Sequence, residues 1–147
     1  MLFRSIVERN QDVVIVYPVH LNPSVQKTVY KVLNDNERIL LIDPVEYDTL
    51  AHLMTTSTLV LTDSGGIQEE APSIGKPVLV MRTETERPEG IEAGTARLVG
   101  PDRDAIVQET ERLLHDDLEY LKMARAVNPY GDGQAAKKIV DIIEKFE

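Results

Sequence analysis

The stretch Leu59-Val60-Leu61-Thr62-Asp63-Ser64-Gly65-Gly66-Ile67-Gln68-Glu69-Glu70 decides the fold class of this chain. A short apolar run, residues 59–62, leads through two glycines into a helical pattern that continues to about Ser73. Runs that are apolar on both faces are typical of buried parallel strands. A strand that passes directly into a helix is the repeating unit of α/β proteins. The segment therefore predicts a strand that ends at Thr62 and a helix that begins near Gly65 and Gly66.

The same alternation of strand and helix extends along the chain. Further strands are expected at the other short apolar runs, which are Val13–Tyr17, Ile39–Ile42, Val78–Met81 and Ala96–Val99. Asn22, Asp102 and Asp116 are N-cap residues in front of helical patterns, and a terminal helix is expected over Gly133–Phe146. Strands separated by helices imply right-handed crossovers. The chain is thus predicted to be one α/β domain over residues 1–147, with a doubly wound, mostly parallel Rossmann-like sheet.

The composition of the chain excludes several classes of function. The 147 residues carry a formal net charge of −9 and no cysteine, which excludes disulfides, thiolate metal sites and cysteine nucleophiles. No apolar run approaches the roughly 20 residues of a membrane span, and the first ten residues lack a signal-peptide layout, so a cytoplasmic protein is expected. A negative field repels nucleic acid and anionic lipid, so neither is expected as a partner. Backbone N–H groups and arginines can still hold a small phosphate ligand.

The turn after Thr62 is the strongest candidate site. Two glycines let a phosphate approach the backbone, and the free N–H groups of a helix start favour an anion. The Ser64 hydroxyl can add a hydrogen bond, and Glu70, one helical turn beyond Gly66, can accept hydrogen bonds from a ribose diol. The alternative is a tight strand-to-helix turn with a surface glutamate.

Three other loops follow expected strands or helices. In residues 82–90, Arg87 can present its guanidinium to a diphosphate, although the loop can equally be a solvated charged segment. His20 lies between a strand and a helix on the ligand side, where a lone histidine is more often plain surface. Asn128–Gly133 is interpreted as a turn before a helix. The three histidines share no metal-ligand spacing, so no metal site is predicted.

Taken together, these segments resemble the non-hydrolysing UDP-N-acetylglucosamine 2-epimerases. The matching stretches occur in order over nearly the whole chain: Tyr17–Pro23 (YPVHLNP), Leu61–Pro72 (LTDSGGIQEEAP), Gly75–Val80 (GKPVLV), Thr85–Gly94 (TERPEGIEAG) and Asn128–Gly133 (NPYGDG). The resemblance implies a GT-B fold of two domains, of which this chain is the C-terminal, UDP-binding half. It also implies an isomerase of nucleotide-sugar metabolism that binds UDP and UDP-N-acetylglucosamine. The missing parts would normally cover the terminal helix Gly133–Phe146 and the cleft-side edge of the sheet, so the bare apolar surface is expected to self-associate into a homo-oligomer, most simply a dimer.

The resemblance also implies roles for individual residues. Ser64, Gly65 and Gly66 would contact the diphosphate, Glu70 the ribose hydroxyls and Arg87 the phosphates. Leu50 falls where the family has a backbone contact to the uracil. His20 falls in a region that lines the cleft, where members of the family bind sugar nucleotide at an activating site.

The departures from the family concern length and catalysis. Family members are more than twice as long, and their N-terminal domain supplies the acid–base residues, so no catalytic residue is expected in this chain. Residues 1–8 match the tail of a helix, which implies that the first strand of the sheet is missing. The family reaction removes the C2 proton and expels UDP, then re-adds UDP after reprotonation from the opposite face. It gives UDP-N-acetylmannosamine without a cofactor, and this chain alone is expected to be inactive.

Two other functions remain open on the sequence. A GT-B glycosyltransferase domain shares the skeleton of Gly66, Glu70, Gly75 and Pro77 and also binds UDP-sugars, although Thr85–Gly94 fits the epimerases better. A non-catalytic nucleotide-binding module is the third interpretation.

Overall fold

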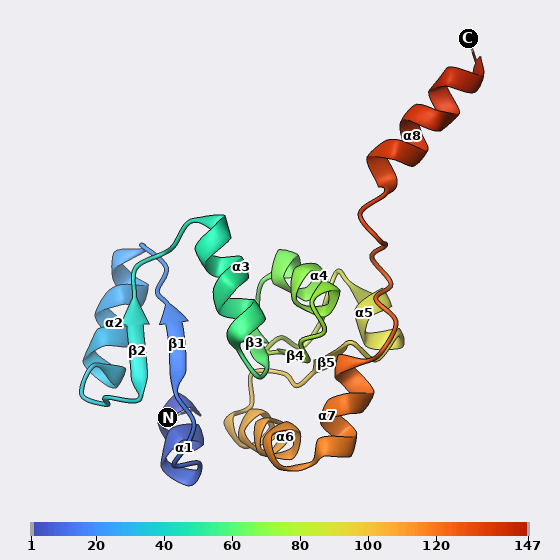
Figure 1. The fold of residues 1–147 in the computed structure, drawn as a ribbon. Helices are drawn as coiled ribbons and strands as arrows, with labels where there is room; N and C mark the ends of the chain where they lie inside the picture. Colours follow the sequence, from blue (N-terminus) through green and yellow to red (C-terminus); the bar gives the residue numbers. More distant parts are fainter. Residues whose placement is uncertain (1, 147) are drawn as a thin grey trace.

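Strands and helices alternate through the computed structural model, which describes residues 2–146 apart from the side chain of Phe146 (Figure 1). The strands are β1 (Ile15–Pro18), β2 (Ile39–Ile42), β3 (Val60–Thr62), β4 (Val78–Val80) and β5 (Ala96–Leu98). The helices are α1 (Leu2–Arg9), α2 (Pro23–Leu33), α3 (Tyr47–Thr56), α4 (Gly65–Ser73), α5 (Pro88–Glu92), α6 (Arg103–His115), α7 (Asp117–Ala124) and α8 (Ala135–Ile143), and a 3-10 turn (Glu144–Phe146) follows α8. The predicted α/β class is confirmed, and α4 begins at the predicted glycine pair.

All strand pairs in the described residues are parallel, but they form two sheets. β1 pairs with β2, with Ile15 opposite Ile39, and β4 lies between β3 and β5, with Val78 opposite both Val60 and Ala96. The sequence predicted a doubly wound, mostly parallel sheet with its first strand missing. Within residues 2–146 no strand lies between β1 and β3, so the sheet is divided at this point.

The core of the larger sheet is built around β4. Val78, Leu79 and Val80 are all fully buried, as a central parallel strand with helices on both faces requires. Val78 and Val80 belong to a cluster with Met54 of α3 and Ala71 of α4. Leu79 points the other way, into a cluster with side chains of α6 and α7. This two-sided burial fixes the carboxyl ends of β3 and β4 in space.

The smaller sheet has its own core and is joined to the rest through α1. Val7, Leu33 and Ile39 form a buried cluster that ties α1 and α2 to β2. Polar contacts link α1 and the turn after it to α6: the Arg103 guanidinium donates to the Ser5 hydroxyl at 2.8 Å, and Asn10 and His115 are hydrogen-bonded at 2.6 Å.

Most helix starts follow their sequence signals. The side chains of Asn22, Asp102 and Asp116 each accept a hydrogen bond from a first-turn N–H, as predicted. Helix α5 differs from the sequence interpretation, because its first residues, Pro88 to Gly90, belong to the polar loop that was expected over residues 82–90. Pro88 at its first position explains the helix, since the fixed φ of proline is compatible with a helix start and its missing N–H is not needed there.

Helix α8 stands away from the rest of the molecule (Figure 1). Its apolar residues are 51–58% exposed, namely Ile139, Val140, Ile142 and Ile143. None of the described residues of this helix is buried. A helix with one strongly apolar face normally packs that face against another element. Self-association through this exposed face stays a prediction.

We expect the exposed face of α8 to drive self-association. Sedimentation velocity across the micromolar range should show dimers for the parent chain and monomers for the double variant Ile139→Lys/Ile143→Lys. Asp141→Lys is the matched control, because it also changes the charge by two units on the same helix but leaves the apolar face intact. A parent chain that stays monomeric over this range would contradict the expectation.

Candidate functional site

The loops after β3 and β4 meet at the carboxyl ends of the strands, and a single buried side chain joins them. Gln68 of α4 is 1% exposed. Its Nε2 donates to the main-chain carbonyl of Ser64 at 3.1 Å, and the Thr85 hydroxyl donates to its Oε1 at 2.5 Å. Thr85 in turn accepts a hydrogen bond from the Arg87 N–H at 3.0 Å. The turn before α4 and the loop that carries Arg87 are thus held in one arrangement.

Ion pairs order the side chains of the 82–87 loop. The Arg87 guanidinium is bound to the carboxylate of Glu69 on α4, and this bond raises the already high pKa of Arg87. Arg82 and Glu86 form a two-pronged pair at 2.8 and 2.9 Å. The predicted solvated loop is therefore a set of exposed and half-exposed ion pairs, and Arg87 lies over the first turns of α4.

The first turn of α4 has no side-chain cap. Ser64 is the N-cap residue, but its hydroxyl makes no capping bond. The Ser64 N–H donates to the Thr62 hydroxyl at 3.0 Å. Serine is among the best N-cap residues, so an unused serine hydroxyl leaves the N–H groups of Gly65 and Gly66 available to another acceptor.

Nothing in the fold of the chain itself requires glycine at positions 65 and 66. Neither adopts a positive φ. A Cβ on Gly65 would have nothing within 4 Å, and one on Gly66 would make only an ordinary contact of 3.6 Å with the Glu70 carboxylate. Because neither backbone conformation nor packing requires glycine here, the open space beside the helix start is the feature that the glycines preserve.

Glu70 lies beside this helix start with one oxygen unused. Its Oε2 is buried and has no hydrogen-bond partner among the described residues. A buried carboxylate oxygen without a partner is costly, so the arrangement favours a ligand that brings hydroxyl donors.

Tyr130 anchors the site loop from the far end of the chain. Its hydroxyl accepts from the Gly90 N–H at 3.0 Å and donates to the Arg87 carbonyl at 3.4 Å. A Cβ on Gly90 would lie 2.6 Å from this hydroxyl, so only glycine allows the approach. The segment Asn128–Gly133 forms the predicted turn, and it also positions α5 and Arg87, which the sequence did not reveal.

Two predicted site residues lie apart from this network. His20 is exposed on the loop after β1, and its Nδ1 accepts from the Asn22 N–H at 3.1 Å. Leu50 is in α3, where its N–H donates to the Glu46 carbonyl at 3.0 Å and its side chain packs against the core of the larger sheet.

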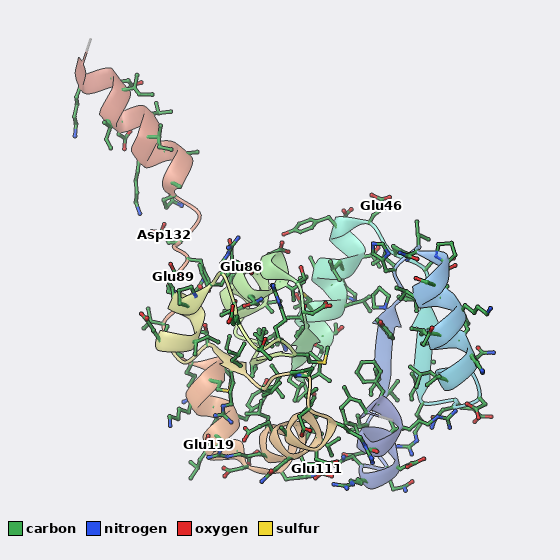
Figure 2. The ribbon with its side chains drawn as sticks, turned by 180° about the vertical axis from the view of Figure 1, so that it is seen from behind. Glu46, Glu86, Glu89, Glu111, Glu119 and Asp132 are labelled. Carbon is green, nitrogen blue, oxygen red and sulfur yellow. The ribbon has the colours of Figure 1, made fainter. Side chains whose placement is uncertain are left out.

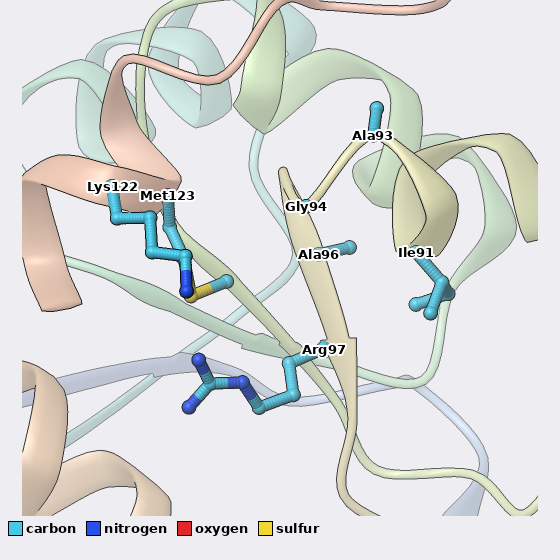
Figure 3. Close-up of a pocket in the computed structure, with 7 residues that line it drawn as sticks. All are labelled: Ile91, Ala93, Gly94, Ala96, Arg97, Lys122 and Met123. Atoms are coloured by element: carbon cyan, nitrogen blue, oxygen red, sulfur yellow. The ribbon is translucent and has the colours of Figure 1, made fainter.

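The surface also has a hollow away from the glycine turn. A cavity of about 350 Å³ lies at the start of β5, the opposite end of the strand from the glycine turn (Figure 3). The guanidinium of Arg97 beside it is paired with Glu109 and Glu119. Six acidic side chains labelled in Figure 2 lie on different elements: Glu46 just before α3, Glu86 in the site loop, Glu89 in α5, Glu111 in α6, Glu119 in α7 and Asp132 before α8. Residues 2–146 contain no group of acids and histidines arranged to hold a metal ion, and no helix long and apolar enough to cross a membrane.

A helix start with two unobstructed glycines at the carboxyl edge of a parallel sheet defines the class of protein: an α/β domain of the kind that places its ligand beside this edge. The family model described as UDP-N-acetylglucosamine 2-epimerase matches residues 1–144. The chain belongs to the UDP-N-acetylglucosamine 2-epimerase family.

Relatives of known name and structure are similar over nearly the whole chain. An Escherichia coli UDP-N-acetylglucosamine 2-epimerase is 57% identical over 140 residues, which is 95% of this chain and 37% of the relative. The Staphylococcus aureus protein MnaA, solved with UDP, is 43% identical with a TM-score of 0.93 over 99% of this chain and 40% of that one. The Neisseria meningitidis UDP-N-acetylglucosamine 2-epimerase, solved with UDP-N-acetylglucosamine, is 44% identical with a TM-score of 0.89 over 97% and 39%. The chain thus spans less than half the length of these relatives.

We expect Gln68→Ala to release the two loops from each other. Removing the side chain leaves the Thr85 hydroxyl and the Ser64 carbonyl without their partner, which should lower the free energy of unfolding by about 1–3 kcal/mol. Amide hydrogen exchange at Arg87 should accelerate as well. Gln108→Ala, at an exposed glutamine of α6, is the control and should change neither value. Unchanged exchange at Arg87 in Gln68→Ala would show that the glutamine does not hold the loop.

Proposed function

We propose that the helix start at Gly65 and Gly66 binds the diphosphate of UDP. The observation that carries this proposal is the uncapped first turn of α4, with two glycines whose missing side chains open onto free space. A helix N-terminus of this kind offers N–H donors and a partial positive charge to an anion. The solved relatives that hold UDP or UDP-N-acetylglucosamine support this choice of anion.

The neighbouring side chains complete the nucleotide site in this proposal. The Ser64 hydroxyl, which caps nothing, donates to the diphosphate, and Arg87 leaves Glu69 to pair with the phosphates. The unused oxygen of Glu70 accepts from the ribose hydroxyls. Leu50 borders the uracil, and His20 lines the wider cleft in which a sugar nucleotide binds.

At the level of the whole protein, we infer an isomerase that interconverts UDP-N-acetylglucosamine and UDP-N-acetylmannosamine at C2. The part of the reaction that belongs to this chain is to hold UDP as it leaves the sugar and as it adds back. Donors fixed around the diphosphate stabilise the charge that develops when the bond to the sugar breaks. Acid–base chemistry at C2 lies outside residues 1–147, and no cofactor takes part. Membership of the epimerase family removes the glycosyltransferase alternative.

Gly65→Ala should weaken UDP binding without lowering the stability of the chain. Alanine favours helix over glycine by up to about 1 kcal/mol, so the variant should unfold at the same or higher denaturant concentration. The added methyl group occupies the approach to the helix N–H groups, so UDP affinity measured by calorimetry should fall by about tenfold or more. Thr28→Ala, at an exposed position of α2, is the control that leaves UDP affinity unchanged. Full UDP affinity in Gly65→Ala would place the diphosphate elsewhere.

Glu70 and Arg87 should contribute to different parts of the nucleotide. Loss of one charge-assisted hydrogen bond costs about 1.5–3 kcal/mol, or roughly 10- to 150-fold in affinity. Arg87→Ala should therefore weaken UDP more than uridine. Glu70→Ala should weaken both alike and reduce the preference for UDP over deoxyuridine diphosphate.

The controls for these two variants remove the same charges far from the site. Arg125→Ala and Glu37→Ala are both at exposed positions and should bind UDP like the parent at the same salt concentration. If Arg87→Ala and Glu70→Ala also bind UDP within about twofold of the parent, the assignment of these residues is wrong.

The chain by itself should not interconvert the two sugar nucleotides, because the groups that move the C2 proton are placed outside it. Incubation of the purified chain with UDP-N-acetylglucosamine, followed by chromatography of the sugar nucleotides, should show no UDP-N-acetylmannosamine. Steady turnover that co-purifies with the chain and disappears in Glu70→Ala would place catalytic groups within it.

A further inference from the structure

The first turn of helix α5 is capped by a side chain from a distant part of the chain. Arg87 is the N-cap residue of α5 but makes no side-chain capping bond. A guanidinium carries only donors, so arginine cannot accept a hydrogen bond from a first-turn N–H. The segment between α7 and α8 passes beside α5 (Figure 1), and there the Tyr130 hydroxyl accepts from the Gly90 N–H at 3.0 Å. Tyr130 therefore fills the capping role that residue 87 cannot fill.

The same hydroxyl also holds the main chain of Arg87. It donates to the Arg87 carbonyl at 3.4 Å, while the Arg87 N–H donates to the Thr85 hydroxyl at 3.0 Å. Burial raises the pKa of the Tyr130 hydroxyl, so the group keeps the proton that it donates. Arg87 has φ −126° and ψ 59°, which is neither helical nor regularly extended. Both main-chain polar groups of Arg87 are thus bonded, the N–H to Thr85 and the carbonyl to Tyr130.

Both segments are shaped for this contact. A Cβ on Gly90 would lie 2.6 Å from the Tyr130 hydroxyl and 3.5 Å from its ring. Gly90 does not adopt a positive φ, so its backbone conformation does not require glycine. On the other side, the Tyr130 N–H donates to the Asn128 side chain at 3.2 Å, which fixes the turn that presents the ring. Glycine at position 90 is therefore explained by the approach of the hydroxyl.

The main chain of Arg87 determines where its guanidinium lies. The side chain pairs with Glu69 of α4 and reaches this position from a backbone fixed at its N–H and its carbonyl. A long side chain loses less freedom on binding when its own backbone is already ordered. Without the hydroxyl, the first turn of α5 would loosen, and ligand binding would have to order it again. That cost cannot exceed what the hydrogen bonds of Tyr130 contribute.

We propose that Tyr130 is a positioning residue for phosphate recognition, because its hydroxyl caps α5 and so holds Arg87 where the guanidinium can pair with the diphosphate of UDP. The proposal rests on the proposed binding of UDP at the start of α4. It adds a residue of the segment Asn128–Gly133 to that site. Tyr130 acts through Arg87 and makes no contact of its own with the nucleotide.

Tyr130→Phe tests the proposal, because it removes the hydroxyl and keeps the ring. UDP affinity measured by calorimetry should fall about three- to tenfold, which corresponds to the neutral hydrogen bonds that are lost. Uridine affinity should not change, since uridine has no phosphate for Arg87. Tyr120→Phe is the matched control, because the Tyr120 hydroxyl also donates to a main-chain carbonyl, that of Thr58 at 3.1 Å. This control should leave both affinities unchanged.

A double-mutant cycle with Arg87→Ala distinguishes positioning from a general effect on the fold. If the hydroxyl acts through the guanidinium, Arg87→Ala and Arg87→Ala/Tyr130→Phe should bind UDP equally. A hydroxyl that only stabilised the chain would weaken UDP by the same factor in both backgrounds. Circular dichroism establishes that the variants are folded. Amide hydrogen exchange at Gly90 should accelerate at least about threefold in Tyr130→Phe, because the N–H loses its acceptor.

Several results would overturn the proposal. Parent-like UDP affinity in Tyr130→Phe, together with weaker binding in Arg87→Ala, would leave the nucleotide site in place and remove Tyr130 from it. Equal losses for UDP and uridine, or the same loss in the Arg87→Ala background, would mean that the hydroxyl acts on the whole fold. Unchanged exchange at Gly90 would show that Tyr130 does not cap α5. Parent-like UDP affinity in Arg87→Ala would contradict the proposed phosphate contact itself, and the role of Tyr130 with it.

Discussion

The hydrogen bonds of the buried Gln68 side chain are the constraint on which the site depends. They connect the last residue before α4 with the loop after β4. The open helix start and Arg87 are therefore held in fixed positions relative to each other. Both attachment points lie at the ends of strands fixed by the two-sided burial of β4. A polar side chain can be buried at this position because both ends of its amide are bonded. The rigid part of the site is thus main chain and glutamine, while Arg87 and Glu69 form the part that a ligand can rearrange.

The ion pair between Arg87 and Glu69 gives the site a defined resting state. Both side chains are more than a third exposed, so water weakens the pair and the cost of separating them is small. A diphosphate carries more charge than one carboxylate and offers several acceptor oxygens. In the proposed site, exchange of Glu69 for phosphate would therefore be favourable, and Glu69 would keep the guanidinium near the helix start until UDP binds.

Local sequence signals predicted the local structure well. The apolar runs gave the strands, Asn22, Asp102 and Asp116 marked helix starts, and the glycine pair marked the start of α4, because each of these effects acts within one turn of chain. Gln68 and Tyr130 could not be predicted, since their partners lie 17 and 40 residues away and depend on the packed fold. Short α5 was hidden by the charged residues around it. The division into two sheets was not predicted either, because apolar periodicity identifies strands but not which strands pair.

The chain combines a well-defined helix-start site with exposed apolar surface on α8. These two features lie in different parts of the fold, so nucleotide binding and association can be measured separately. The proposed site depends on whether a diphosphate binds at the N–H groups of Gly65 and Gly66. A crystal structure of the chain with UDP tests it most directly. The account predicts diphosphate oxygens about 2.7–3.2 Å from the Gly65 and Gly66 nitrogens, with the Arg87 guanidinium moved from Glu69 to the phosphates. UDP bound away from the start of α4, with Arg87 still paired to Glu69, would contradict it.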